Sequence, residues 1–111
     1  MKLAVLEDNM MVALPLIELA RQQGFEVEVW NTATEALARL TSDTPTHLVM
    51  AMRLADPDLV NLLKDRARVA AYGPHVDGSR FQELRRWGVR DVWPNSRLPD
   101  KYPKWLSGAE S

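Results

Sequence analysis

The chain has 111 residues, of which 46% are hydrophobic and 26% charged, a balance typical of an ordinary folded domain and not of a disordered segment. Its formal net charge of −1 gives no general attraction to nucleic acid or to an anionic membrane. The sequence has no cysteine, which excludes disulfides, thiolate metal sites and a cysteine nucleophile.

Apolar runs and helical patterns alternate in the first half of the chain. Residues 3–6 form a continuous apolar run, typical of a strand buried on both faces. Residues 10–23 place apolar side chains at helical spacing. Residues 27–30 alternate and include β-branched side chains, which predicts a second strand. Thr32 and Glu35 then form a capping-box pattern, which predicts the start of a second helix.

The same alternation continues in the second half. Residues 47–52 predict a third buried strand, and Asp56 followed by a proline has the chemistry of a helix start. Residues 68–72 predict a fourth strand and residues 91–93 a short fifth strand. Between these two strands lies a helical pattern that ends at Gly88.

The end of the chain carries three prolines from Pro94 onward, which predicts an irregular segment over residues 99–111. Only a short helix, around Lys104 to Leu106, fits its pattern. We therefore expect a single domain over residues 1–111, with its core at about residues 1–98.

The order of elements, βαβαβαβαβ, predicts a parallel sheet with helices on both faces and right-handed crossovers. The common strand order in a five-stranded sheet of this kind is 2-1-3-4-5, and its ligands bind at the carboxyl ends of the strands. The sequence therefore predicts an α/β fold of the flavodoxin-like type, with a shortened last helix.

Several segments of the chain, in this order, resemble the receiver domain of response regulators. The first strand is followed by Glu7 and Asp8, which is similar to the acidic pair that holds Mg²⁺ in that family. Three further segments resemble the link to the second strand, the second helix and the approach to the fifth strand: residues 23–27, 34–37 and 87–91. The resemblance covers about residues 1–98 and implies a receiver-like fold.

The same resemblance implies that the family's phosphorylation chemistry is missing. It places Met52 at the phospho-accepting aspartate, Gly73 at the serine or threonine after the fourth strand, and Pro94-Asn95 at the Lys-Pro after the fifth. A thioether cannot accept a phosphoryl group, and it is a poor ligand for a hard cation. We therefore expect a pseudo-receiver whose degenerate phosphorylation pocket keeps only the acidic pair.

Glu7 and Asp8 allow two interpretations. They could hold a residual Mg²⁺ or Ca²⁺ ion, although two carboxylates without a third protein oxygen make a weak site. They could instead be structural, with Asp8 or Asn9 capping the next helix and Glu7 solvated beside it. We expect the structural interpretation, and therefore no bound cofactor.

Arg53 and His75 also fall at the carboxyl ends of strands. Arg53 could bind an anion there, but an exposed surface arginine is the simpler interpretation. His75 could act as a general base, but no nucleophile accompanies it, so we expect a loop histidine. The other histidine, His47, falls at the opposite end of the sheet, so we do not expect a metal site made by the pair.

Aromatic and basic residues gather in the predicted fourth helix and the segments that follow, on the face through which receivers signal. They are Arg85, Arg86, Trp87, Arg90, Trp93 and Arg97. Because tryptophan and arginine are enriched at interfaces, this face could bind a protein partner or a second copy of the chain. Alternatively, the tryptophans cover a core left thin by a short last helix. Acidic residues interleave with the arginines and no nucleic-acid-binding motif is present, so we do not expect nucleic acid to bind.

These patterns predict a non-catalytic signalling module that binds a protein partner or itself. No nucleotide-binding loop or nucleophile elbow is present, so we do not expect an enzyme. The alternative is a domain that binds a small ligand or anion at the strand ends through Glu7, Asp8, Arg53, Gly73 and His75. No segment has the length of a signal-peptide core or a membrane span, which predicts a cytoplasmic location.

Overall fold

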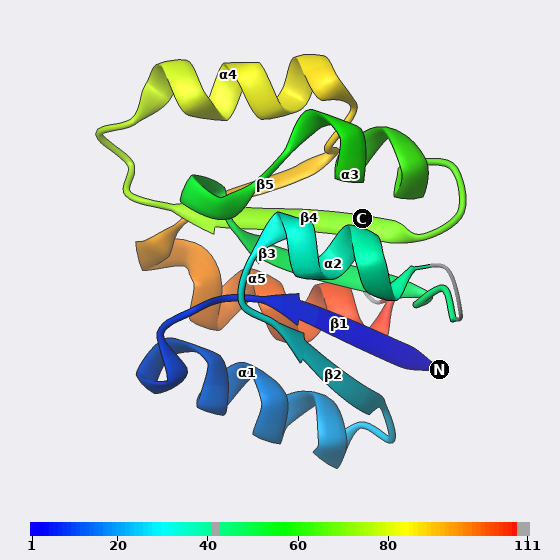
Figure 1. Cartoon of the computed structure of the whole chain (residues 1–111). Coiled ribbons are helices and arrows are strands. Elements are labelled where there is room, and N and C mark those ends of the chain that lie inside the picture. The colour runs from blue at the N-terminus through cyan, green and yellow to red at the C-terminus, as the bar shows by residue number, and fades with distance from the viewer. Residues whose placement is uncertain (41–42, 109–111) are drawn as a thin grey trace.

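A computed structural model describes residues 1–40 and 43–108 and contains one parallel sheet between two layers of helices (Figure 1). The elements are β1 (Lys2–Leu6), α1 (Met10–Gln22), β2 (Glu26–Trp30), α2 (Ala33–Arg39), β3 (His47–Ala51), α3 (Pro57–Leu63), β4 (Arg68–Gly73), α4 (Gly78–Trp87), β5 (Asp91–Pro94) and α5 (Leu98–Ser107). Two short 3₁₀ turns, η1 (Met52–Leu54) and η2 (Asn95–Arg97), follow β3 and β5. The strand order is β2-β1-β3-β4-β5, which confirms the predicted fold.

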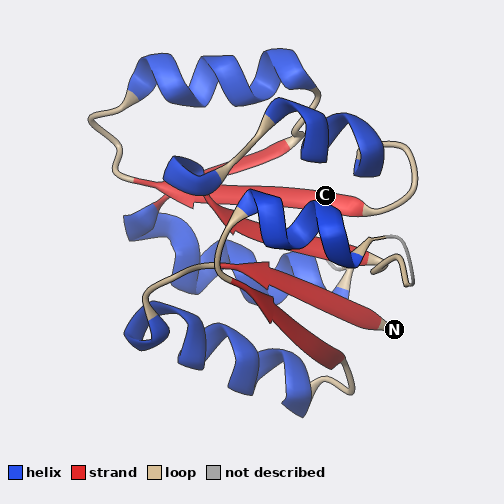
Figure 2. Cartoon of the chain, viewed as in Figure 1, coloured by secondary structure: helices blue, strands red, loops and turns tan. Residues whose placement is uncertain are grey.

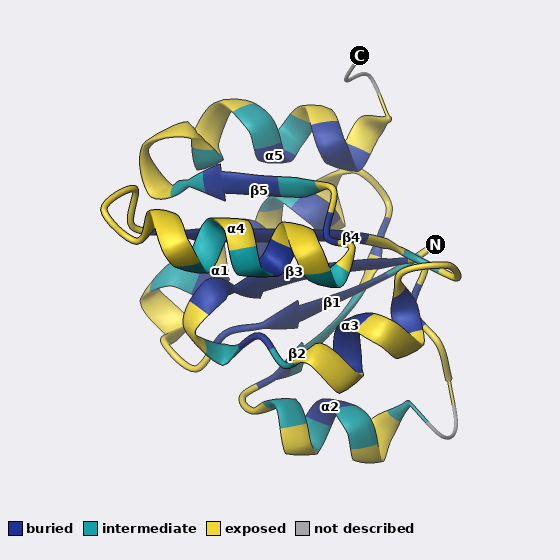
Figure 3. Ribbon diagram, turned by 90° about the horizontal axis from the view of Figure 1, so that it is seen from above, coloured by how far each residue is buried: buried dark blue, intermediate teal, exposed yellow. Residues whose placement is uncertain are grey.

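The central strands are buried on both faces, as Figure 3 shows in dark blue. Successive strand residues alternate between two cores: Leu6 and Met50 pack under α2, α3 and α4, whereas Val5 and Val49 pack under α1 and α5. Figure 2 shows the same layers by element type. Because each strand residue is covered whichever way it points, these strands consist of continuous apolar runs.

Side-chain caps fix where α1, α2 and α3 begin, as the sequence predicted. Thr32 accepts a hydrogen bond from the Glu35 N–H at 3.0 Å, and Asp56 accepts one from the Asp58 N–H at 3.0 Å. Of the two residues predicted to cap α1, it is Asn9 that does so, accepting from the Met11 N–H at 3.0 Å. These bonds satisfy backbone donors that a helix start otherwise leaves unpaired.

The prediction of an irregular segment from residue 99 is wrong for residues 99–107, which form most of α5. Pro99 lies in the first turn, where a helix needs no backbone N–H. Tyr102, Trp105 and Leu106 are buried against the sheet and anchor the helix despite Pro103 inside it. The helix is short, as predicted, and residues 109–111 lie outside the described part of the chain.

His47 lies inside an aromatic cluster at the amino end of β3. It is 5% exposed and packs edge-on against Phe25 and Trp105, with ring centroids 4.9 and 5.2 Å away. Burial, assisted by the positive charge of Arg68, lowers the pKa of His47 to about 4. The folded protein therefore keeps this imidazole neutral at pH values where the unfolded chain protonates it.

Acid should consequently destabilise the fold through His47. Below about pH 6.5 the unfolded chain binds a proton that the folded protein excludes, so stability falls with falling pH until about pH 4. The loss from this group should be at most about 3 kcal/mol. Urea unfolding between about pH 7 and pH 5 should show this slope in the wild type and in His75→Gln. If His47→Gln showed the same dependence of unfolding free energy on pH, His47 would not be the group responsible.

Candidate functional site

The parallel register brings four predicted site residues to one edge of the sheet. Glu7 and Met52 directly follow β1 and β3, Gly73 ends β4, and Asn95 follows β5. The pairs Leu6–Met50 and Gly73–Pro94 are in register, which aligns the carboxyl ends of all four strands. The site predicted from the sequence is therefore assembled in space at this edge.

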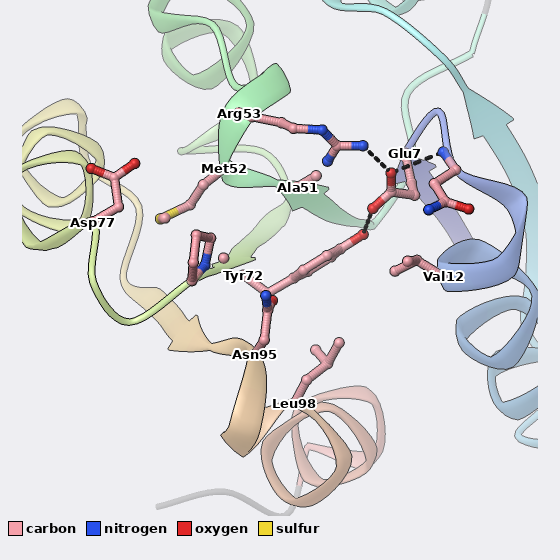
Figure 4. A pocket seen from close by; sticks show the side chains of 12 residues that line it. Glu7, Val12, Ala51, Met52, Arg53, Tyr72, Asp77, Asn95 and Leu98 are labelled. Atoms are coloured by element: carbon pink, nitrogen blue, oxygen red, sulfur yellow. Dashed lines mark hydrogen bonds and ion pairs between the residues drawn. The ribbon is translucent and has the colours of Figure 1, made fainter.

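Glu7 is the centre of a hydrogen-bonded network at this edge and is only 1% exposed. Its Oε1 accepts a hydrogen bond from the Tyr72 hydroxyl at 2.7 Å, and its Oε2 accepts from the Asn9 N–H at 3.0 Å. The guanidinium of Arg53 donates to the same Oε2 at 2.6 Å (Figure 4). The expectation that Glu7 is solvated is therefore wrong, because its carboxylate is buried. The three donors replace the water that burial removes.

The network holds Glu7 in its ionised form. Burial alone would raise the pKa of Glu7, but hydrogen bonds from Arg53, Tyr72 and the Asn9 N–H outweigh burial and lower it. Burial also raises the pKa of Tyr72, and its hydrogen bond to Glu7 adds to this shift. Tyr72 therefore remains a protonated donor facing a carboxylate, and this arrangement fixes both side chains.

Arg53 also pairs with Asp8, so a single guanidinium joins both members of the acidic pair. Its side chain is 53% exposed, as expected for a surface arginine, but its charge is directed at these carboxylates. Divalent Mg²⁺ and Ca²⁺ require several oxygen ligands, and the site offers two carboxylates already paired to a cation. Among the described residues, no group of three His, Cys, Asp or Glu side chains could hold a metal ion. The residues present therefore do not fit a divalent cation.

Met52 and Gly73 form a matched pair beside this network. Met52 is 2% exposed and lies directly over Gly73. A Cβ atom added to Gly73 would overlap the Met52 methyl group and would stand 3.1 Å from both Cβ and Cγ of Met52. The glycine therefore makes room for the methionine, and no residue with a side chain fits at position 73 without moving Met52.

A cleft of about 560 Å³ lies between this network and η2. Its lining comprises Glu7, Asn9, Val12, Ala51, Met52, Arg53, Tyr72, Gly73, Pro74, Asp77, Asn95 and Leu98. Figure 4 shows Met52 forming one wall, with Val12 and Leu98 on the side opposite Arg53. His75 is exposed in the loop after β4 and does not line the cleft, so it stays a loop histidine.

No protein-family model matches the sequence, and no curated protein matches it. Solved structures match over the whole fold. The chemotaxis response regulator CheY4 of Vibrio cholerae is 15% identical, with a TM-score of 0.79 and 98% of each chain covered. A response regulator receiver domain protein from Clostridium thermocellum is 16% identical, with a TM-score of 0.80 over 97% of this chain and 92% of that one. The fold is that of a receiver domain.

A third solved structure with this fold contains a phosphorylated aspartate. A response regulator from Burkholderia pseudomallei, solved with a phosphorylated aspartic acid, a calcium ion and citrate, is 17% identical. Its TM-score is 0.78, over 99% of this chain and 66% of that one. At these identities the matches establish the fold alone, so the chemistry of this chain has to be inferred from its own residues.

Arg80 links this edge of the receiver fold to α4, and the sequence analysis missed it. Its guanidinium donates to the backbone carbonyls of Met52 and Ala55 at 3.0 and 2.9 Å. The same group lies over the ring of Trp87, 4.9 Å from its centroid, and pairs with Glu83. Arg80 therefore fixes α4 to the turn after β3. No sequence pattern signals a contact between residues so far apart in the chain.

The predicted partner face is only partly exposed. Trp93 is 5% exposed and packs against Trp105, so the prediction that it contacts a partner is wrong and its role is to fill the core. Arg97 follows the carboxyl end of β5 and pairs with Asp100, whereas Arg90 precedes the amino end of that strand. Arg85, Arg86 and Arg90 remain exposed together around the end of α4, and Trp87 is half-buried beneath Arg80.

Gly73→Ala should cost about 1–2 kcal/mol of stability, because the new methyl group enters space that Met52 fills. In a Met52→Ala background the same substitution should cost about 1 kcal/mol less, since most of the obstructing side chain is gone. Thermal or urea unfolding of the wild type, the two single variants and the double variant measures the coupling energy between positions 52 and 73. Gly78→Ala is the control, because nothing lies within 4 Å of its added Cβ. An equal loss of stability in both backgrounds would contradict the packing of Met52 over Gly73.

Proposed function

We propose that this chain is a receiver-like interaction module that works without phosphorylation. The observation that carries the proposal is Met52, which directly follows β3 and is packed over Gly73. A thioether offers no oxygen for phosphoryl transfer, and the glycine offers no hydroxyl beside it. Phosphoryl transfer depends on placed charge and metal, and the described residues at this edge of the sheet supply neither an acceptor nor an unpaired cation.

The Arg53 network supports independence from metal as well. Arg53 neutralises Glu7 and Asp8 with a covalently attached cation, so the acidic pair needs no divalent ion to be stable. Because this cation is part of the chain, the edge of the sheet keeps one arrangement whatever the metal or phosphoryl-donor concentration. A module of this kind would signal through its abundance or through binding to a partner. Phosphorylation would not switch it between states.

The module would be non-enzymatic and would act through a protein partner or a second copy of itself in the cytoplasm. Among the described residues, no helix is long and apolar enough to cross a membrane. The exposed arginines around the end of α4 are the part of the predicted partner face that remains available for binding. Arginine is among the residues enriched at protein interfaces, which supports a protein partner.

Incubation with acetyl phosphate and Mg²⁺, followed by intact-mass measurement, tests this function. The expected result is no phosphoryl adduct on this chain, since no acceptor carboxylate follows β3. The Burkholderia pseudomallei response regulator is the positive control, because its structure holds a phosphorylated aspartic acid. A stoichiometric adduct on this chain would overturn the proposal.

The cleft at the strand ends favours a second candidate, the binding of a small ligand. The walls of the cleft carry the apolar side chains of Val12, Met52 and Leu98, and Asn95 and Asp77 are polar groups in its lining. Arg53 is engaged by Glu7 and Asp8, so the ligand would be uncharged instead of the anion considered from the sequence. Screening neutral fragments by NMR tests this candidate, and shifts confined to Val12, Asn95 and Leu98 would support it.

A further inference from the structure

Two further hollows lie at the opposite end of the sheet. Their linings come from the region where α3 and α4 end and β4 and β5 begin, and Figure 1 shows these element ends at the right. The hollows measure about 500 and 540 Å³ and share Lys64, Asp65, Gly88 and Arg90 in their linings. Arg68 lines one of them and Arg85 the other. We call these two hollows the basic cleft, because among the described residues of their lining the cations outnumber the carboxylates, Asp65 and Asp91.

The fold holds Lys64 in place at the rim of the basic cleft. Gly88 ends α4 with a φ of 107°, a left-handed conformation that favours glycine. The stem of Lys64 lies over this glycine, and a Cβ atom added there would stand 2.9 Å from Cδ of Lys64. The contact between α3 and the end of α4 therefore positions the ammonium group, so less side-chain entropy is lost when an anion binds.

Three of the cations that line the basic cleft have no carboxylate partner among the described residues, unlike most cations elsewhere on the surface. Lys2, Arg53, Arg80, Arg97 and Lys104 all pair with carboxylates within 4 Å. Lys64, Arg85 and Arg90 form no such pair with any described residue. The carbonyl ends of α3 and α4 attract Lys64 and Arg85, but Arg90 lies outside any helix. Attraction to the carbonyl end of a helix could therefore explain Lys64 and Arg85, but it does not explain the position of Arg90.

We propose that the basic cleft binds an acidic segment of a protein partner. This inference rests on the proposed function and deepens it, because it selects one part of the predicted partner face and gives the partner a chemistry. Arginine binds carboxylates through paired hydrogen bonds, and Arg85 and Arg90 present two guanidinium groups beside Lys64. Neighbouring Asp or Glu side chains on an extended peptide match this arrangement.

The lining favours a peptide over nucleic acid. Asp65 and Asp91 lie among the cations and would repel a continuous phosphate backbone, whereas a peptide can place its carboxylates between them. None of the described residues that line the basic cleft is aromatic, so they offer no surface on which bases could stack. The cations are exposed, so binding should weaken steeply as salt is added.

Fluorescence anisotropy with a labelled peptide of alternating glutamate and serine, at low ionic strength, tests the proposal on the full chain. Arg85→Gln/Arg90→Gln should weaken binding about tenfold, which corresponds to about 1.4 kcal/mol. The matched control, Arg21→Gln/Lys104→Gln, also removes two exposed positive charges and should weaken binding less than about twofold. Circular dichroism melting checks that both variants remain folded.

Amide shifts give a second readout that does not depend on the variants. The peptide should move the signals of Lys64, Gly88 and Arg90 and leave those at the carboxyl ends of the strands unchanged. Absence of binding, equal weakening in both variants, or tighter binding of a single-stranded oligonucleotide of equal charge would each overturn the proposal. The acetyl phosphate experiment does not involve the basic cleft, so a failure here is distinguishable from a failure of the proposed function.

Discussion

Trp105→Ala should lower the free energy of unfolding by about 3–5 kcal/mol, a large part of the stability of a domain this size. Trp105 is fully buried and lies against Trp93, Tyr102 and His47, with ring centroids 5.2–6.2 Å away. Removing the indole leaves a cavity between α5 and the sheet that no neighbour can fill without moving. Urea or thermal unfolding, followed by far-UV circular dichroism, measures the loss.

Trp87→Ala is the control for this substitution. Trp87 is half-buried on α4 and contacts Arg80, so its loss should cost about 1–2 kcal/mol. If the two variants lost equal stability, α5 would not be the anchored helix that the structure contains. A strongly destabilised Trp105 variant would establish that the C-terminal segment belongs to the core.

Arg53→Ala should cost about 2–3 kcal/mol near neutral pH, although the arginine itself is half-exposed. Its partner Glu7 is 1% exposed, and without the guanidinium a buried carboxylate keeps only the Tyr72 and Asn9 donors. The pKa of Glu7, lowered in the wild type, should rise in the variant. The deficit should therefore shrink on acidification, when the unpaired Glu7 of the variant takes up a proton.

Arg97→Ala is a matched control, because Arg97 is 55% exposed and also pairs with a carboxylate. Its partner Asp100 is 49% exposed, so this loss should cost about 0.5 kcal/mol or less. Unfolding of both variants by urea at about pH 7 and pH 4 compares them directly. A deficit for Arg53→Ala as small as that for Arg97→Ala would mean that Glu7 does not depend on its guanidinium partner.

The fold could be predicted because its signals are local. Buried strands of a parallel sheet are continuous apolar runs, and helix starts need polar caps such as Thr32 and Asp56, which a sequence displays directly. α5 could not be predicted in this way. Its prolines argue against a helix, and what holds it is the burial of Trp105 and Tyr102 against the sheet, a tertiary effect that outweighs local propensity.

The candidate site could be predicted as a set of positions but not as a network. The strand ends placed Glu7, Met52 and Gly73 together, since all parallel strands end at one edge. The partners of Glu7 lie 46 and 65 residues away, at Arg53 and Tyr72, and no short-range pattern links them. A tyrosine near the end of a buried strand was the available signal, because a buried phenol needs a hydrogen-bond partner.

The sequence also could not predict which residues of the partner face are exposed. Composition alone could not separate Trp93, which fills the core, from Arg85 and Arg90, which remain exposed at the end of α4. The aromatic enrichment of interfaces applies equally to small cores, and only the packing of α5 distinguishes the two cases.

The central claim, that this receiver fold works without phosphorylation, is tested most directly by two-dimensional amide NMR with Mg²⁺ and beryllofluoride, which mimics a bound phosphoryl group. The account predicts a spectrum unchanged from that of the protein alone, with Mg²⁺ or with both additions. Large shifts that cluster at Glu7, Met52 and Gly73 would contradict it, because they would mean that this edge of the sheet binds the metal and the phosphoryl mimic.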